Sequence, residues 1–457
     1  MKKSFILVFL WAIASTSRGN NGSLDDGFLS EVTGDVLATV VQEDGKILIG
    51  GGFGSINGVE RYRVARLNAD GSLDLSFNAG AGDWQGEVRA FAVQPNRQII
   101  VGGDFYRVNG VIKNGVMRLN PDGTLDESFS TGSGPAGGGV NSIAIQPDGR
   151  ILIAGEFTKV NGTNRSRIAR LHADGSLDVT FLNVGSGPNG TITSMQLQPD
   201  GKVFIGGAFT AIGGTPRNSI AKLKTDGNLD ISFYPGDFPS GSSINSVAVS
   251  TSGQVLVGGG FQISLGFKSS LFNLARLNPD GGLDLAFQPF TDGQVYSIAV
   301  QQDSKIIFAG RFQTVSNVAS TSLARLNVDG TLDTTFAPGL APNPALLTVN
   351  SVSLQADARA LIAGNFKSIN GVTRVGIARL NADVFSPELD LSMRMFAGVS
   401  LTGVLRGKYR LEYAVDIKDP TAWTSLADVI MTNVPTLFID TAPPGGARRF
   451  YRAVALP

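Results

Sequence analysis

The stretch Arg170-Leu171-His172-Ala173-Asp174-Gly175-Ser176-Leu177-Asp178-Val179-Thr180-Phe181 decides the fold of this chain. Its Asp-Gly pair suits a tight turn, and the residues on either side suit two short antiparallel strands. The stretch therefore predicts a β-hairpin that ends in a large apolar anchor. Close copies of it begin at Arg66, Arg118, Lys222, Arg276 and Arg325.

A second phrase, residues 140–157, recurs between the copies of the first. It contains Gln146-Pro147-Asp148-Gly149-Arg150, in which proline, aspartate and glycine suit successive positions of a three-residue hairpin loop. Each repeat of roughly 50 residues thus predicts two hairpins, or four short strands, which we name a, b, c and d. Counterparts of the second phrase end at Phe53, Phe105, Phe209, Phe261, Phe312 and Phe366.

Four strands per repeat at this period are typical of a β-propeller blade. A parallel β-helix is the alternative, but its rungs are shorter and do not need two hairpins each. The a–b phrase and the c strand each occur seven times, whereas strand d follows a c strand only six times. We therefore predict an all-β, seven-bladed propeller of four-stranded blades over residues 20–385.

The missing copy of strand d occurs at the start of the chain, as Ser23-Leu24-Asp25-Asp26-Gly27-Phe28. A strand supplied by the N-terminus would complete the last blade and remove an open sheet edge. The alternative closure uses Leu389-Asp390, which would leave residues 23–28 without a role.

The repeat register also predicts ion pairs between strands c and d, which would fix the register rather than add much stability. The expected pairs are Arg66–Asp74, Arg118–Asp126, Arg170–Asp178, Lys222–Asp230, Arg276–Asp284, Arg325–Asp333 and Arg379–Asp25. Three a–b turns, at Arg97, Ser304 and Ala358, lack the turn glycine. We expect those hairpins to be looser or to use another turn type.

Residues 146–157 and 169–181 resemble the bacterial delta-60 repeat, a propeller-forming repeat of unknown function. The resemblance covers roughly residues 23–383. It implies a β-propeller and no established catalytic residues.

The two ends of the chain differ from the repeats. Lys2, Lys3, the apolar run 5–13 and the small residues around Ala14 predict a signal peptide over residues 1–19, and hence a secreted or cell-surface protein. The alternative is a membrane anchor, but about nine apolar residues are too few to span a bilayer. Residues 386–457 contain alternating stretches such as 409–415 that predict a small C-terminal β-sandwich, expected to attach the protein to the cell envelope.

Composition excludes several kinds of function. The chain has 38 basic and 38 acidic residues, so a nucleic-acid or anionic-membrane binder is not expected. It has no cysteine and one histidine, His172, which occupies a turn position that asparagine or lysine fills in the other repeats. Thiol chemistry, a multi-histidine metal site and a Ser-His-Asp triad are therefore not expected, and we predict no cofactor.

The loops that vary between repeats join strand d to strand a and strand b to strand c, and they share one face of the predicted propeller. Variable loops on a rigid scaffold are where binding usually resides. The slot that precedes the strand-b phenylalanine also varies in charge. The candidate ligand-binding residues are Asp83, Trp84, Asp104, Tyr106, Glu156, Tyr234, Asp237, Phe238 and Arg311, with Phe267, Phe272 and the loop 132–139 nearby.

These observations predict a secreted, non-enzymatic binding or scaffold protein whose variable loops contact an unknown protein or glycan. The aromatic candidates could instead pack into the loop cores, and Trp423 is expected in the core of the C-terminal module rather than on a sugar-binding surface. The alternative function is a secreted glycosidase that uses carboxylates such as Asp104 and Glu156.

Overall fold

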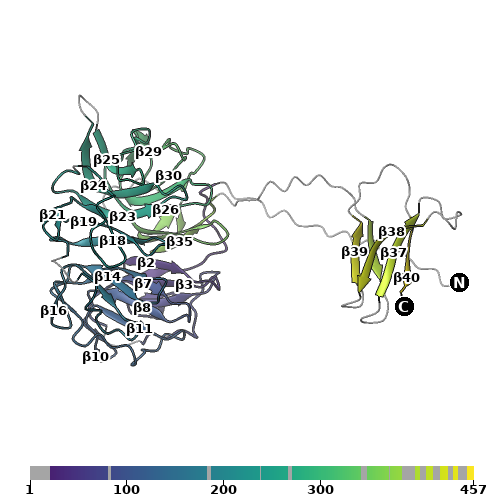
Figure 1. Cartoon of the computed structure of the whole chain (residues 1–457), viewed down its shortest axis with the longest axis horizontal. Helices are drawn as coiled ribbons and strands as arrows, with labels where there is room; N and C mark the ends of the chain where they lie inside the picture. Colours follow the sequence, from purple (N-terminus) through teal and green to yellow (C-terminus); the bar gives the residue numbers. More distant parts are fainter. Residues whose placement is uncertain are drawn as a thin grey trace. The chain divides into compact units, whose positions relative to one another are not determined.

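The computed structural model describes residues 21–80, 84–182, 187–236, 238–265, 270–340, 347–369, 371–382, 397–401, 408–414, 423–430, 436–440 and 450–456. These residues form β-strands and turns, and none of them is helical, so none forms a helix that could cross a membrane. The chain divides into two compact units, Met1–Phe385 and Ser386–Pro457 (Figure 1). The predicted signal peptide lies outside the described residues.

Each repeat of the first unit forms an antiparallel three-stranded sheet in which strand b lies between strands a and c. We number these sheets blades 1 to 7 in chain order (Figure 1). In the order a, b, c they are β2 (Val36–Val41), β3 (Ile47–Gly51) and β6 (Val64–Leu67); β7 (Val88–Val93), β8 (Ile99–Gly103) and β11 (Val116–Leu119); β13 (Val140–Ile145), β14 (Ile151–Gly155) and β17 (Ile168–Leu171); β18 (Ile192–Leu197), β19 (Val203–Gly207) and β22 (Ile220–Leu223); β23 (Ser243–Val249), β24 (Val255–Ser264) and β25 (Ser270–Leu277); β26 (Gln294–Val300), β27 (Ile306–Arg311) and β30 (Leu323–Leu326); and β31 (Thr348–Leu354), β32 (Ala360–Asn365) and β35 (Ile377–Leu380).

Strand d is shorter than the repeat pattern predicts. In blade 2, Leu125 forms a single antiparallel bridge with Leu119, and the chain then turns at Asp126. Asp126 N still donates to Arg118 O at 2.9 Å, but the backbone N–H and hydroxyl of Ser128 both donate to Asp126 Oδ1, at 2.9 and 2.6 Å, and the strand ends in this turn. The prediction of four short strands per blade is therefore confirmed only in part: strands a, b and c form the sheet, and the fourth strand is reduced to a single bridging leucine.

The blades pack face to face, and strand b is buried on both sides. Strand a of each blade contacts strand a of the next, and β31 of blade 7 contacts β2 of blade 1. At that last contact the hydroxyls of Thr39 and Ser351 are 3.0 Å apart. Leu48 of blade 1 shares a core cluster with Phe91 and Val101 of blade 2, which illustrates how each interface is filled. Burial of strand b on both faces explains its continuous apolar sequence.

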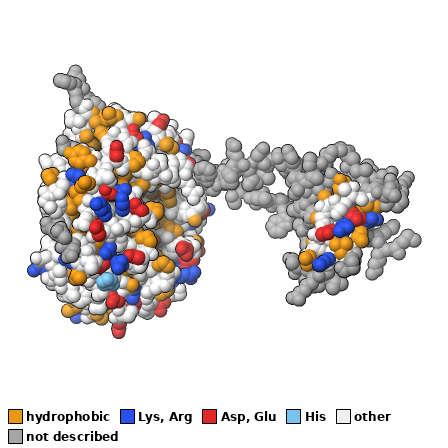
Figure 2. Space-filling model, viewed as in Figure 1, with side chains coloured by type: hydrophobic (Ala, Val, Ile, Leu, Met, Phe, Trp, Pro, Cys, Tyr) orange, Lys and Arg blue, Asp and Glu red, His pale blue; other side chains and the backbone are white. Residues whose placement is uncertain are grey.

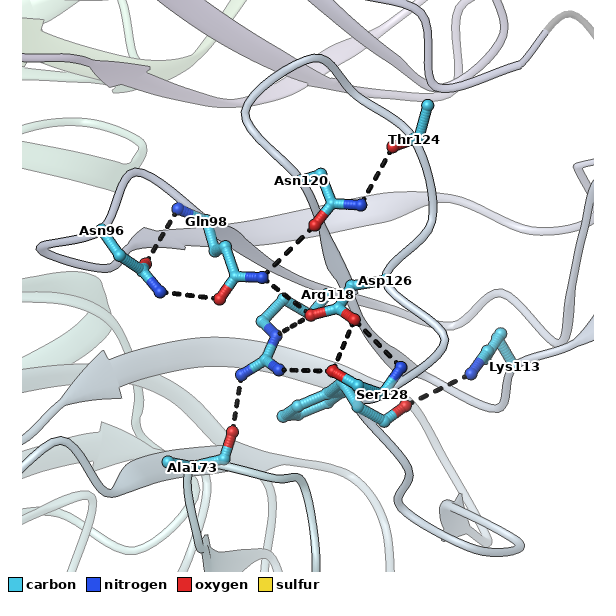
Figure 3. A network of polar contacts seen from close by, with 10 residues as sticks. Asn96, Gln98, Lys113, Arg118, Asn120, Thr124, Asp126, Ser128 and Ala173 are labelled. Atoms are coloured by element: carbon cyan, nitrogen blue, oxygen red, sulfur yellow. Dashed lines mark hydrogen bonds and ion pairs between the residues drawn. The ribbon is translucent and has the colours of Figure 1, made fainter.

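Arg118 on strand c connects two blades (Figure 3). Its Nε donates to Asp126 Oδ2 at 2.6 Å, and its Nη1 donates to the carbonyl of Ala173 in the c–d turn of blade 3 at 2.6 Å. The guanidinium lies 4.9 Å from the ring centroid of Phe129. Gln98, at the end of the a–b turn, also donates to Asp126 Oδ2 at 2.8 Å. The predicted pair is therefore present, and it also joins one blade to the next.

The same c–d ion pair recurs in most repeats. Lys222 is the exception, because its Nζ lies 5.0 Å from the ring centroid of Phe204 while Lys202 pairs with Asp230 at 3.0 Å. An ammonium group lacks the forked donors that let arginine bind a carboxylate and a turn carbonyl together. The prediction is confirmed for Arg66–Asp74, Arg118–Asp126, Arg170–Asp178, Arg276–Asp284, Arg325–Asp333 and Arg379–Asp25, and is wrong for Lys222–Asp230.

The segment 21–28 lies against strand c of blade 7. Leu24 forms an antiparallel bridge with Leu380, and Asp25 N donates to Arg379 O at 2.8 Å. Asn381 N donates to Ser23 O at 2.8 Å. This segment therefore has the position that strand d has in the other blades. Leu389-Asp390, the alternative partner, lies outside the described residues.

The a–b turns that lack glycine keep the common turn geometry. Arg97, Ser304 and Ala358 have φ values of 66°, 65° and 64°, and Gly149 has 82°. The closing hydrogen bond from residue 97 to Gln94 O is 2.8 Å, compared with 2.9 Å from Gly149 to Gln146 O. The prediction of looser or different turns is wrong. These three side chains instead occupy a backbone region that glycine tolerates better.

The second unit contains two antiparallel sheets within its described residues. One pairs β36 (Ala397–Leu401) with β39 (Thr436–Asp440), and the other has the order β38 (Thr424–Ile430), β37 (Lys408–Ala414), β40 (Phe450–Ala455). Leu411 is fully buried among neighbours that include Leu426. The half-buried Trp423 stacks with Arg452, whose guanidinium carbon lies 4.3 Å from the ring centroid.

Candidate functional site at the variable face

Small two-stranded hairpins between strands b and c form one end of the blades, which we call the variable face. Blade 2 has β9 (Arg107–Val108) and β10 (Val111–Ile112), whereas blade 5 extends β24 and β25 instead. The segment before strand a pairs with the hairpin, as Gln85 does with Arg107. The a–b and c–d turns lie at the opposite end of the strands, the turn face. The hairpins therefore surround the starts of the a strands.

Each a strand begins with a β-bulge, which changes the direction of a side chain. In blade 2 the register with β8 shifts between Val88 and Ala90, so Arg89 is the bulged residue. The equivalent residues of the other blades differ in chemistry and are all partly exposed. They are Leu37, Asn141, Thr193, Asn245, Tyr296 and Asn350.

Arg89 joins two of the predicted site residues. Its Nη2 donates to Asp104 Oδ2 at 2.8 Å, and its Nη1 lies 3.4 Å from Glu156 Oε1 and 3.1 Å from Asn141 Oδ1. Asp104 follows β8 and Glu156 follows β14, so the cluster spans blades 2 and 3. Asp104 Oδ1 also accepts the backbone N–H of Glu87 at 2.7 Å. The structure thus brings Asp104 and Glu156 together around a guanidinium.

The surroundings of Asp104 and Glu156 can be compared with those of glycosidase carboxylates. The general acid of a glycosidase is normally held protonated by an apolar environment. The side chains of Asp104 and Glu156 are 37% and 45% exposed, and both face Arg89. Fixed carboxylate, guanidinium and amide groups are well placed to exchange hydrogen bonds with a polar ligand. Among the described residues, no group of three or more acidic or histidine side chains could hold a metal ion.

The aromatic candidates divide into buried and exposed residues. Trp84 is 6% exposed and packs edge-on against Phe105, and Phe238 packs in the same way against Phe261. Both are core residues, as the packing alternative expects. Tyr106 and Tyr234, in contrast, are 54% and 52% exposed.

Tyr234 carries a further contact, because the guanidinium of Arg217 lies 4.9 Å from its ring centroid. The half-buried Phe272 lies on β25. Within the loop 132–139, β12 (Pro135–Ala136) pairs with β15 (Lys159–Val160). Asp83, Asp237 and Phe267 lie outside the described residues.

Arg311 differs from Arg89 in its surroundings. It ends β27 of blade 6, is exposed and forms no ion pair with a described residue. It lines a hollow of about 240 Å³ with Asp292, Gln313 and Thr321. The bulged Tyr296 lies on the adjacent strand β26, and its hydroxyl has no hydrogen-bond partner among the described residues. Blade 6 therefore presents a cation and an aromatic hydroxyl at the variable face.

Sequence reasoning missed Arg89 and Tyr296, although a signal for them was present. Both occupy the bulge position near the start of strand a, which in chain order holds Leu, Arg, Asn, Thr, Asn, Tyr and Asn in repeats that otherwise agree. The bulge that exposes this position has no sequence signature of its own. Away from the site, charged side chains of both signs are interspersed on the surface of the first unit (Figure 2), and the exposed His172 lies in a c–d turn.

Repeated sheets around this face define a repeat β-propeller. A family sequence profile described as "Domain of unknown function (DUF5122) beta-propeller" matches residues 42–77, 94–129, 146–181, 198–233, 251–287, 301–336 and 355–383, and the chain belongs to this family. No curated protein matches the chain.

Several solved structures are similar to the chain at low sequence identity. The extracellular domain of a putative one-component system from B. thetaiotaomicron is 15% identical, with 85% of this chain and 43% of that chain covered and a TM-score of 0.48. The WD40 β-propeller domain of Doa1 is 12% identical over 78% and 96%, with a TM-score of 0.45. A gluconolactonase from Xanthomonas campestris is 16% identical over 62% and 85%, with a TM-score of 0.38. The chain spans less than half of the first of these proteins.

Proposed function

We propose that this chain is a secreted, non-enzymatic binding or scaffold protein that recognises a glycan or a protein through the variable face. The observation that carries the proposal is the cluster of Arg89, Asp104, Glu156 and Asn141, which places charged and amide groups from two blades at one point of that face. Secretion rests on the signal-like residues 1–19.

We further propose that the first unit is a closed, seven-bladed ring in which residues 21–28 complete the last blade. The bridge between Leu24 and Leu380, and the contact between β31 and β2, support this closure. In such a ring, blade 6 lies opposite the junction of blades 2 and 3. Arg311 and Tyr296 would then face the Arg89 cluster across the mouth of the central channel.

A glycan is the favoured ligand because of the groups that this mouth would present. Carboxylate, guanidinium and amide side chains make paired hydrogen bonds with hydroxyl groups. Tyr296 adds an aromatic ring with a hydroxyl, a combination that is favoured at binding surfaces. The two sheets of residues 386–457 are proposed to pack as a β-sandwich that attaches the protein to the cell envelope.

A glycan array tests the ligand class. The protein without residues 1–19 is expected to bind a restricted set of glycans, and a chain that ends at Val384 is expected to bind the same set. If the chain that ends at Val384 no longer binds these glycans, the binding site does not lie on the variable face alone. An array on which no glycan is bound would exclude glycans and leave a protein as the partner.

The alternative function is a glycosidase that uses Asp104 and Glu156. It is tested by release of nitrophenol from a panel of aryl glycosides. The binding proposal predicts no release above that of the Glu156→Gln variant. Turnover that the wild type shows and this variant lacks would establish the enzyme.

A further inference from the structure

Arg311 on the variable face has no counter-ion among the described residues, whereas Arg89 has two. It ends β27 of blade 6, its side chain is exposed, and it forms neither an ion pair nor a hydrogen bond with a described side chain. A role for this guanidinium in binding rests on the proposed function, because it specifies the kind of glycan that the variable face would bind. The unpaired positive charge points to a ligand that carries a negative one.

The repeat makes the surroundings of Arg311 comparable with those of the Arg89 cluster. That cluster consists of the bulged residue and the residue before the strand-b phenylalanine, each from two adjacent blades. Blades 6 and 7 are also adjacent, since β26 and β27 both contact β31. In chain order the same four positions hold Tyr296, Arg311, Asn350 and Asn365. The junction of blades 6 and 7 therefore has one cation, one phenol and two amides, and no carboxylate at these positions.

The side chains of these four residues do not pair with one another, unlike those of the Arg89 cluster. Asn350 Nδ2 donates to the carbonyl of Val36 at 3.1 Å, and its Oδ1 accepts no hydrogen bond from a described residue. The exposed amide of Asn365 and the hydroxyl of the partly exposed Tyr296 have no partner among the described residues either. A ligand could therefore replace water at all of these groups without breaking a hydrogen bond within the protein.

Asp292 is the acidic residue that lines the hollow beside Arg311. Its Oδ1 accepts the backbone N–H groups of Gln313 and Thr314, at 2.8 and 2.9 Å. Asn189 accepts two equivalent backbone hydrogen bonds in blade 4, at 2.8 and 3.0 Å, so these contacts do not require a charge. Asp292 is exposed and forms no ion pair with a described residue, so solvent and salt screen its carboxylate from Arg311.

The chemistry of these groups matches an acidic sugar. A guanidinium presents paired N–H donors that fit a carboxylate, and amide and phenol groups exchange hydrogen bonds with hydroxyls. The hollow has a volume of about 240 Å³, below the usual range for a drug-sized molecule, so it suits one sugar unit. We propose that the junction of blades 6 and 7 binds a uronic acid unit of a glycan, with its carboxylate on Arg311 and its hydroxyls on Tyr296 and Asn365.

The test is calorimetric titration of the full chain with trimers of galacturonate, glucuronate, mannuronate and guluronate. Each trimer is compared with its methyl ester, which keeps the sugar and removes the negative charge. We expect at least one trimer to bind about fivefold or more tightly than its ester at about 50 mM salt. The difference should shrink at about 500 mM salt, because screening weakens an exposed charge–charge contact.

Three variants separate the guanidinium from other effects. Arg311→Gln should bind the uronate and its ester equally, with the affinity for the ester unchanged. Asp292→Asn keeps an oxygen for the two backbone hydrogen bonds and should bind the uronate at least as tightly as the wild type. Arg97→Gln removes an exposed arginine from the turn face and should bind both ligands like the wild type. All three substitutions are at exposed positions, so the thermal stability should be unchanged.

Two results would overturn this inference and leave the proposed function intact. One is that neutral glycans bind the protein while no uronate trimer binds more tightly than its ester. The other is a preference for the uronate that persists in Arg311→Gln, which would place the carboxylate elsewhere on the protein. Absence of binding by every glycan, neutral or acidic, would instead remove the glycan from the proposed function, and this inference with it.

Discussion

Arg379 and Asp25 are separated by 354 residues, and Arg379 Nε donates to Asp25 Oδ2 at 2.7 Å. Arg379 Nη1 also donates to the carbonyl of Ala69 in the c–d turn of blade 1. One guanidinium thus joins the N-terminal segment, blade 7 and blade 1. The contact links the two ends of the repeat array, and the stability of the first unit should depend on it.

Removal of the carboxylate is expected to destabilise the first unit. Asp25→Ala leaves Arg379, which is almost fully buried, without its charged partner, and should lower the free energy of unfolding by about 3 kcal/mol. The measurement is the urea midpoint of the first unit. Asp26→Ala is the control, because the Asp26 side chain is 89% exposed and should change little. Equal midpoints for the two variants would contradict the closure.

Acid should unfold the first unit through the strand-d aspartates. Burial alone would raise the pKa of Asp178, but hydrogen bonds from Thr180 and the contact with Arg170 outweigh it and lower the pKa to about 2. The same balance lowers the pKa of Asp74 and Asp333. A carboxylate whose pKa is depressed in the folded state stabilises it above the unfolded value of about 4. That stability is lost as the pH falls from about 4 towards 2.

Denaturant midpoints between pH 7 and pH 2 measure this dependence. The midpoint should be nearly constant down to about pH 4 and then fall steeply. Asp178→Asn should be less stable at neutral pH and should lose less on acidification. A midpoint that falls mainly between pH 7 and pH 5 would implicate other groups.

The repeat architecture was largely predictable from the sequence because each turn has its own chemistry. Asp-Gly pairs and the Leu-Asp-x-x-Phe segment located the hairpins, and the spare copy at Ser23–Phe28 predicted the pairing with Arg379. The single-bridge form of strand d was not predicted, because Asp126 serves both as a strand residue and as a turn residue. The alternation of residues cannot show which of the two roles prevails.

Turn glycines that touch a neighbouring blade should tolerate substitution worse than those that face solvent. Gly123 has φ of 90°, and an added Cβ would lie 2.7 Å from the backbone nitrogen of Asn78. Gly123→Ala should cost about 3 kcal/mol, from strain and the backbone clash together. Gly149→Ala has a similar φ of 82° and open space, so about 1 kcal/mol is expected. Similar unfolding midpoints for the two variants would show that the interface between the blades accommodates the added methyl group at little cost in stability.

Trp84 and Tyr106 should behave differently although both were predicted as ligand-binding residues. Trp84→Ala removes a core side chain and should destabilise the first unit by about 3–5 kcal/mol. Tyr106→Ala removes an exposed ring and should change stability by less than about 0.5 kcal/mol. Thermal unfolding of both variants checks this. A stable Trp84→Ala protein would mean that the indole is not a core residue.

The candidate site was predictable only in part. Asp104 and Glu156 stood out because their slot varies in charge between repeats. Their common partner Arg89 did not stand out. It occupies a strand position between buried residues, and the sequence pattern there does not reveal the bulge. The same limit applies to Trp84 and Phe238, whose loop positions suggested exposure while their size favoured burial.

The most direct test of the binding proposal is calorimetric titration of the strongest glycan on the array. The wild type is compared with Asp104→Asn/Glu156→Gln and with Glu43→Gln, an exposed carboxylate on the turn face. We predict that the double variant keeps the thermal stability of the wild type but binds the glycan at least tenfold more weakly, which is a loss of at least about 1.4 kcal/mol of binding free energy. Glu43→Gln should bind like the wild type. Unchanged affinity in the double variant would contradict the assignment of the variable face as the binding site.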